Sequence, residues 1–543
     1  MKRSHFPVVL NKRDTVKSVL ACIYVVLVFV PLIVMLTHIT PASIRNTLAS
    51  PNFFPALRNS VLAASLTTAI TLVLSYLLAY CTQRVQIRGK ILIETLFTLP
   101  MLVPTVSHGM GLIFLFGNSG FFTKLLGIKS HIYGLPGIIL GSVLYAFPVA
   151  YLMFADVMKY EDGSQYEAAG ILGISRFHQF TQISLPYMKK PIISVTFTVF
   201  SLVITDYGVP LMIGGKFNTL PVILYQEVIG GLNFSTGAVC GVPLLIPAFI
   251  LFLFDALNRD KAKNSFVTHP ITQKKTLTAK IFAAVLCSLT GIFMILPILS
   301  FIMIGFAEAY PMNLTFTTDH FRRTFQMGTG GYIFTSIVIA LCVSAFGVCV
   351  SFLTAYMSAR MPSKASSLLH LAAITSTAIP GIVLGLSYVL TFKGSFIYDS
   401  IGIFIMINMI HFISSPYLMS YNSLTKLNQN LENVGQTLGV PRSRIIIDVL
   451  LPMCKNTLVE MFGYFFVNCM TTISAVSFLA SGRIKPISLM INQFEAQMQF
   501  EAAAVVSLSI LLVNFLVKLL IYFFKIRDNS VNKKSKEKKC CVC

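Results

Sequence analysis

The chain has 543 residues, of which 55% are hydrophobic and only 11% are charged, whereas soluble domains carry about 25% charged residues. This composition excludes an ordinary water-soluble enzyme. The formal net charge of +22 would suggest nucleic acid as the partner of a soluble protein, but in a membrane protein it reports where the basic loops lie. We therefore expect membrane lipid, and no nucleic acid, around this chain.

Twelve apolar segments are long enough to cross a bilayer as helices, which takes about 20 residues. They predict an all-α polytopic membrane protein with about twelve transmembrane helices. Pro100, Pro104 and Pro380 lie inside two of these segments and are candidates for helix kinks. In chain order the segments are 18–37, 61–81, 91–116, 136–157, 191–213, 238–256, 279–306, 332–358, 367–392, 401–421, 457–480 and 502–524.

The basic residues predict the orientation of these spans. If the N-terminus is cytoplasmic, the internal loops and the two tails hold 31 Lys and Arg residues and the external loops hold 10. Short cytoplasmic loops carry the excess of positive charge in membrane proteins. We therefore expect a multi-pass protein of the bacterial plasma (inner) membrane with both termini in the cytoplasm.

The two halves of the chain resemble each other, with several residues repeated at one constant displacement. Because each half has six spans, the two repeats share one orientation in the membrane. The predicted units are a first half at 1–256, a cytoplasmic linker at 257–278, a second half at 279–526 and a basic cytoplasmic tail at 527–543. The matching residues are Ala79, Tyr80, Arg84, Pro104 and Gly109 in the first half and Ala355, Tyr356, Arg360, Pro380 and Gly385 in the second.

The cytoplasmic loop after the fourth span of each half, at 161–190 and 426–456, contains a second repeated pattern, with identical spacing in both copies. This spacing predicts a short helix, a glycine turn, a second short helix and a proline at the start of the next span. Such an element suits docking into the groove of another protein, although a loop that packs on its own bundle is the alternative. The residues are Glu167, Ala168, Ala169, Gly173, Ile183, Leu185 and Pro186, then Asn433, Val434, Gly435, Gly439, Val449, Leu451 and Pro452.

This pattern resembles the EAA loop of the membrane subunits of binding-protein-dependent ABC importers, here in a form with two fused halves. The resemblance implies the type I importer fold, and a coupling helix in each half that docks on an ATPase subunit. The second loop departs from the family pattern because Asn433 stands in place of Glu167, while Glu432 lies one residue earlier.

The resemblance also implies the partners, which are two copies of an ATPase subunit and an extracytoplasmic solute-binding protein. The chain contains no GxxxxGK[ST] phosphate loop, so ATP and Mg are expected on the partner ATPase. We expect no cofactor, no resident metal and no catalytic site in this chain.

The translocation pathway has four candidate residues. Asp206 and Tyr207 lie in the fifth span, where Gly208 and Pro210 can interrupt the helix and expose backbone groups to a cavity. Thr472 and Ser474 occupy the corresponding stretch of the second half. An alternative for Asp206 is an ion pair with Lys216 near the outer interface.

The solute is the least determined property. The chain resembles fused permeases of ferric-iron importers and others assigned to 2-aminoethylphosphonate, and more distantly those for thiamine, and we place ferric iron first. A secondary carrier of the major-facilitator type also has twelve spans in two parallel repeats, but it offers no reason for the paired loops.

Overall fold

The computed structural model describes residues 12–540, apart from residues 86, 128, 160, 258–275, 311 and 429. Most of the linker predicted at 257–278 and the end of the tail, 541–543, therefore lie outside the described residues. The regular secondary structure of the described chain is helical except for one small antiparallel hairpin. The predicted all-α fold is thus confirmed, and the hairpin is an addition that the sequence pattern did not indicate.

The described part of the first half contains thirteen α-helices, several of which are too short to cross a membrane. They are α1 (Lys12–Thr37), α2 (Pro41–Ala49), α3 (Phe53–Arg84), α4 (Lys90–Thr98), α5 (Thr105–Phe116), α6 (Phe121–Leu126), α7 (Leu135–Lys159), α8 (Ser164–Ile171), α9 (Arg176–Gln179), α10 (Leu185–Thr205), α11 (Gly208–Ile213), α12 (Leu220–Ile229) and α13 (Phe234–Leu257).

The second half follows the same plan, with the hairpin inserted after its first helix. Its elements are α14 (Leu277–Phe306), β1 (Ala307–Ala309), β2 (Asn313–Phe316), α15 (Asp319–Thr324), α16 (Gly330–Ala359), α17 (Lys364–Ile374), α18 (Gly381–Phe392), α19 (Ile401–Phe412), α20 (Ser414–Thr425), α21 (Asn430–Thr437), α22 (Arg442–Ile445), α23 (Leu451–Met453), α24 (Lys455–Thr471), α25 (Ile487–Ala496) and α26 (Phe500–Cys540).

Every predicted span corresponds to helical chain, but several spans are interrupted. Within the described residues, eight helices are long and apolar enough to cross a membrane, and the pair α19 and α20, bent by 53°, makes a ninth. The other three predicted spans correspond to α13, which is apolar over Phe234–Ile250, to the broken pair α17 and α18, and to α24. Twelve crossings therefore remain consistent with the structure, although fewer than twelve are continuous helices.

The third span of each half is broken rather than kinked. In the first half α4 ends at Thr98, and α5 begins only at Thr105, after Pro104. In the second half α17 ends at Ile374 and α18 begins directly after Pro380. Proline lacks the backbone donor that a continuous helix needs, and it disfavours helical geometry in the residue before it. Both breaks therefore follow from the prolines.

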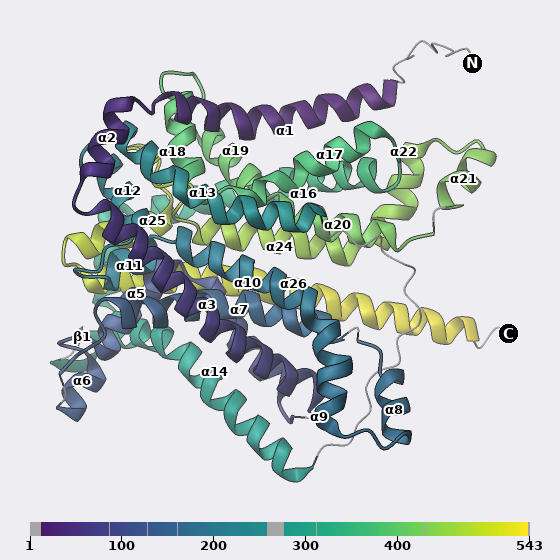
Figure 1. The fold of residues 1–543 in the computed structure, drawn as a ribbon, viewed down its shortest axis with the longest axis horizontal. Helices are drawn as coiled ribbons and strands as arrows, with labels where there is room; N and C mark the ends of the chain where they lie inside the picture. The colour runs from purple at the N-terminus through teal and green to yellow at the C-terminus, as the bar shows by residue number, and fades with distance from the viewer. Residues whose placement is uncertain are drawn as a thin grey trace.

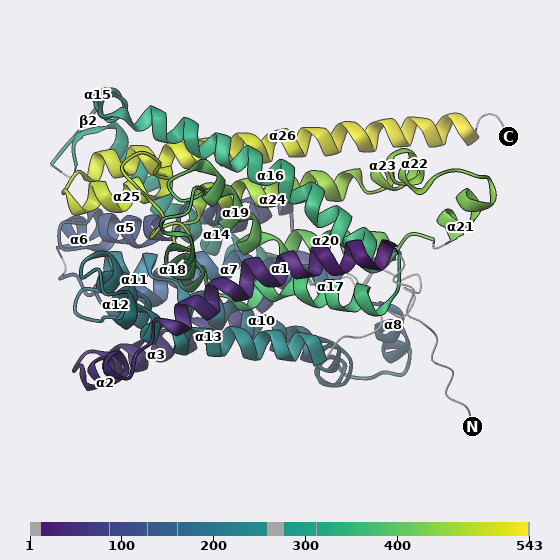
Figure 2. The same ribbon diagram turned by 90° about the horizontal axis from the view of Figure 1, so that it is seen from above.

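The elements sort to two ends of an elongated bundle. The helices α8 and α21, the start of α1 and the end of α26 lie at one end, while α2, α6, α12 and the hairpin lie at the other (Figure 1). The view from above in Figure 2 shows the same separation. The two repeated loops, which contain α8 and α21, therefore share one end of the molecule.

The two halves interlock through their first helices. Helix α1 packs against α17 and α18 of the second half, where the Tyr388 hydroxyl donates to the Leu27 carbonyl at 2.9 Å. In return α14 packs against α4 and α5 of the first half. A Cβ added at Gly111 of α5 would lie 2.7 Å from the Pro297 Cβ of α14, so these two helices are in very close contact.

Candidate coupling loops and pathway

The first loop folds as a helix, a tight turn and a second helix. Gly173 follows α8 with φ +70°, a left-handed conformation that glycine adopts without the steric cost of a Cβ. The turn is closed by a hydrogen bond from the Ile174 amide to the Ala169 carbonyl at 3.0 Å. Ser175 then caps α9 by accepting from the His178 amide, and a π-helical turn leads into α10, whose first turn contains Pro186.

The second loop repeats this backbone with different side chains. Gly439 has φ +73°, and the Val440 amide donates to the Gly435 carbonyl at 2.8 Å. Helix α22 and a π-helical turn follow, and Pro452 lies in the first turn of α23. The helix, turn and helix predicted from the spacing are present in both halves.

Large apolar side chains on both loops face away from the bundle. In the first loop Ile171 is 87% exposed and Leu172 is 75% exposed, and in the second Leu438 is 72% exposed. Phe177, Val434 and Ile447 are also exposed. Exposed apolar patches of this kind mark interaction surfaces, and the exposure argues against a loop that packs only on its own bundle.

The predicted docking residues are distributed unevenly over this surface. Those exposed are Glu167, Ala168, Gly173, Leu185, Pro186, Asn433, Val434, Gly439 and Pro452, whereas Ala169 is buried and Ile183, Gly435, Val449 and Leu451 are half-buried. Sequence reasoning missed Ile171, Leu172 and Phe177. Their signal was an apolar side chain inside a loop that was already assigned to the cytoplasm.

Glu432 does not replace the acid that the second loop lacks. Its carboxylate is buried in an ion pair with Arg360, and the Arg360 Nε donates to the Glu432 Oε1 at 2.7 Å. Asn433, at the position of Glu167, is exposed. The two loops therefore present different charges at equivalent positions.

Asp206 lies at the break between α10 and α11. Its side chain is 8% exposed, and its oxygens accept from the Gly208 amide at 3.2 Å and the Val209 amide at 3.0 Å. A carboxylate at a helix N-terminus is stabilised by these unpaired amides. No ion pair joins Asp206 to Lys216 among the described residues, so the alternative of an interfacial salt bridge receives no support.

Tyr207 connects the two halves of the chain at the break between α10 and α11. It is fully buried, its ring stacks on Tyr225 with centroids 4.7 Å apart, and its hydroxyl forms a hydrogen bond with Ser477 of the second half. Ser477 was not among the residues singled out from the sequence, because a serine in an apolar stretch gives no pattern. The interrupted fifth span of the first half thus meets the interrupted eleventh span.

Thr472 and Ser474 lie in the stretch after α24 and are half-buried. The Thr472 carbonyl accepts from the Ser488 hydroxyl at 2.7 Å. A Cβ added at Gly381 would collide with the Ser474 Oγ, and one added at Gly208 would collide with the Thr105 Oγ1. Because these two contacts occupy equivalent positions in the two halves, the broken third and fifth spans meet in the same way in each.

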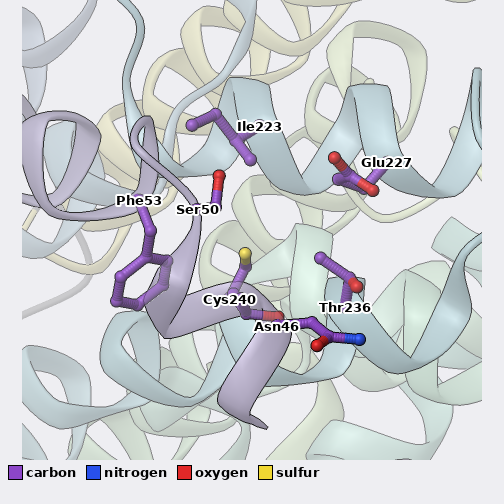
Figure 3. A pocket seen from close by; sticks show the side chains of 8 residues that line it. Asn46, Ser50, Phe53, Ile223, Glu227, Thr236 and Cys240 are labelled. Atoms are coloured by element: carbon purple, nitrogen blue, oxygen red, sulfur yellow. The ribbon is translucent and has the colours of Figure 1, made fainter. Parts of the chain in front are cut away.

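A cavity lies apart from these residues, at the end of the molecule opposite to the coupling loops. It is lined by Asn46, Thr47, Ser50, Phe53, Ile223, Glu227, Thr236 and Cys240 (Figure 3). None of the pathway candidates contributes to it. Within the part of the chain that the structure describes, no three or more His, Cys, Asp or Glu side chains are grouped so that they could hold a metal ion.

Comparison with known proteins gives one family. Residues 71–263 and 347–527 each match the model of the binding-protein-dependent transport system inner membrane component. The chain is 22% identical to the ferric transport system permease protein FbpB of Actinobacillus pleuropneumoniae, over 92% of this chain and 75% of that protein. It is 23% identical to the Fe(3+)-transport system permease protein FbpB 2 of Haemophilus influenzae, over 88% and 91%. It is 21% identical to the thiamine transport system permease protein ThiP of Escherichia coli, over 85% and 87%.

Proposed function

Because the chain belongs to the family of inner membrane components of binding-protein-dependent transport systems, we propose that it forms the solute pathway of an ATP-driven importer. The two matches to the family make it a fused permease with two homologous halves. The pathway runs between these halves, past the facing breaks at Asp206, Tyr207, Thr472 and Ser474. The contact between Tyr207 and Ser477 supports this location because it joins the two halves at the broken spans.

Two copies of a separate ATPase subunit dock on the two coupling loops. The single observation that carries this assignment is the repeated backbone around Gly173 and Gly439, with exposed apolar side chains on both copies. ATP and Mg are bound by that partner. An extracytoplasmic binding protein delivers the solute at the opposite end, where α2, α6 and the hairpin lie (Figure 1).

The coupling loops and both termini face the cytoplasm of a bacterial cell. The excess of basic residues in the loops and tails predicted to be cytoplasmic, 31 against 10, supports the orientation. The exposed apolar surface of the bundle supports a surrounding bilayer, since side chains such as Val73, Ile91 and Phe282 are more than half exposed.

The solute is ferric iron. This proposal is supported by the ferric transport permeases that align with most of this chain, and the thiamine permeases of similar coverage make thiamine the main alternative, ahead of 2-aminoethylphosphonate. The extracytoplasmic binding protein that delivers solute to this chain can be purified and titrated with ferric iron, thiamine and 2-aminoethylphosphonate. Tight binding of thiamine or 2-aminoethylphosphonate, with none of iron, would contradict the assignment.

Reconstituted vesicles test the mechanism. We expect vesicles that contain the permease and its ATPase to take up ferric iron from the loaded binding protein only while ATP is hydrolysed. Vesicles with a non-hydrolysable ATP analogue serve as the control. Equal uptake driven by an ion gradient without ATP would instead identify a secondary carrier.

A further inference from the structure

An arginine ends the second membrane helix of each half and reaches from it to the coupling loop. Arg84, at the end of α3, forms an ion pair with Glu161, and the two side chains are 9% and 4% exposed. Arg360, at the end of α16, forms an ion pair with Glu432, with side chains 2% and 10% exposed. The two arginines occupy equivalent positions in the repeat of the two halves, but the two acids are not equivalent to each other.

The two halves place the glutamate that pairs with the arginine at different positions of the coupling loop. When the two coupling loops are aligned on their glycines, Glu161 corresponds to Leu427 and Tyr166 corresponds to Glu432. In the first half the Tyr166 hydroxyl donates to the Glu161 carboxylate. In the second half the Arg360 Nη1 donates to the Leu427 carbonyl at 2.8 Å. The same three positions therefore converge in both halves, and the carboxylate comes from the first loop position in one half and the second in the other.

Tyr166 supports the carboxylate from the other side. Burial raises the pKa of the Tyr166 hydroxyl, and its hydrogen bond to Glu161 raises it further. The phenol therefore stays protonated and keeps donating to the carboxylate. The second half has no tyrosine at this position, because Glu432 itself occupies the position that corresponds to Tyr166.

The buried pairs give orientation more than stability. Taking two charges out of water costs free energy that their attraction roughly offsets, so an apolar pair could pack equally well. A guanidinium, however, holds a carboxylate and several carbonyl oxygens in a fixed planar geometry. Arg360 also donates to the Leu424 carbonyl at 3.3 Å and the Asn428 carbonyl at 2.7 Å, and so joins the ends of α16 and α20 to α21.

The arginine helices are well placed to transmit a displacement. Helix α3 packs against α7 and α10, and α16 packs against α20 and α24. Both α10 and α24 end at the broken segments that contain the pathway candidates. A movement of the coupling loop that carries α3 or α16 with it would therefore reach those breaks.

We propose that Arg84–Glu161 and Arg360–Glu432 are positioning contacts that make each coupling loop move as one body with its membrane helix. The proposal rests on the proposed function, because it assumes that an ATPase displaces the loops. It goes further by assigning the mechanical connection to four named residues that do not touch the ATPase surface or the solute.

The test uses the complex of the full chain with its ATPase and the loaded binding protein. We expect Glu161→Leu to keep the bound ATPase but to lower solute uptake per ATP hydrolysed by about tenfold or more, the size of a typical coupling between sites. Introducing the second-half arrangement into the first half, with Glu161→Leu and Tyr166→Glu together, restores coupling. The second half allows the reciprocal experiment. We expect Glu432→Tyr alone to uncouple transport from ATP hydrolysis, and Glu432→Tyr together with Leu427→Glu to restore coupling.

Two further variants act as controls. Glu460→Gln removes an ion pair with Lys525 that lies outside both coupling loops and whose side chains are 46% and 32% exposed, and it leaves coupling unchanged. The double variant Arg84→Gln, Glu161→Gln removes both buried charges without leaving one unpaired, so it inserts normally and is still uncoupled.

Three results would overturn the proposal while leaving the proposed function intact. The first is normal coupling in both Glu161→Leu and the double glutamine variant. The second is that Tyr166→Glu fails to restore coupling to the Glu161→Leu chain. The third is loss of the ATPase from the Glu161→Leu complex, which would show that the ion pair only supports the docking surface. A wild-type chain that binds no ATPase would instead refute the proposed function itself, and with it the link.

Discussion

Gly173 and Gly439 carry the same left-handed conformation in loops whose side chains have diverged. An added Cβ would meet no atom within 4 Å at either position, so the requirement for glycine is local and comes from the positive φ. Asp206 has a local structural role in addition to the predicted role in the pathway. Its carboxylate accepts from two amides at the start of α11, so it holds the broken fifth span in place.

At the residue scale, we expect Gly173→Pro and Glu167→Arg to abolish uptake and to weaken association with the ATPase, while membrane insertion stays normal. Proline is restricted to a φ near −65° and cannot adopt +70°, and arginine reverses the charge on an exposed position of α8. Uptake and co-purification of the ATPase measure the effect.

Gly331→Ala is the control for the glycine. Gly331 lies inside α16, outside both coupling loops, and an added Cβ would meet nothing within 4 Å, so alanine stabilises the helix by up to about 1 kcal/mol and leaves uptake unchanged. Full co-purification of the ATPase with both test variants would contradict the docking role of the loop.

At the scale of elements, close helix contacts are fixed by glycines that face another helix. A Cβ added at Gly109 would lie 3.2 Å from the Val209 carbonyl oxygen, and one added at Gly385, the equivalent position of the repeat, would lie 2.7 Å from the Ala475 carbonyl oxygen. The glycine that the sequence repeat places at 109 and 385 therefore lies where the third span of each half packs against the short segment after the break in the fifth span.

Gly111 gives an element-scale prediction about the contact of α5 with α14. We expect Gly111→Val to lower the free energy of unfolding by about 1–3 kcal/mol, because the new side chain overpacks the contact with Pro297. The unfolding midpoint of the purified protein measures this change. Gly331→Ala, where an added Cβ meets no atom within 4 Å, should leave the midpoint unchanged, and an equal loss in both variants would show that α5 and α14 do not constrain this site.

At the scale of the whole molecule, the halves exchange their first helices. Lys17 of α1 is buried and donates to the Met361 carbonyl at 2.7 Å and to Ser363 at 3.0 Å, and both acceptors belong to the second half. Tyr24 of α1 also forms a hydrogen bond with Thr354 at 3.0 Å. Each half thus completes the core of the other.

We expect two separately expressed chains, 1–263 and 264–543, to assemble into a working permease. The contacts of α1 with α17 and α18 and of α14 with α4 and α5 do not depend on a covalent linker. Co-purification of a tagged first half with the second half measures assembly. A first half without α1 should recover much less of the second half, and equal recovery would show that the exchanged helix does not hold the halves together.

The sequence by itself determined the helical class, the repeat, the backbone of both coupling loops and the position of the breaks at Pro104 and Pro380. These properties depend on hydropathy, spacing and the backbone limits of glycine and proline, which act over a few residues. Only the tertiary structure decided that Glu432 pairs with Arg360, that Tyr207 reaches Ser477 and that α1 packs on the opposite half. Those contacts join residues 72, 270 and 361 positions apart, and no local preference of the chain encodes which distant side chains will meet.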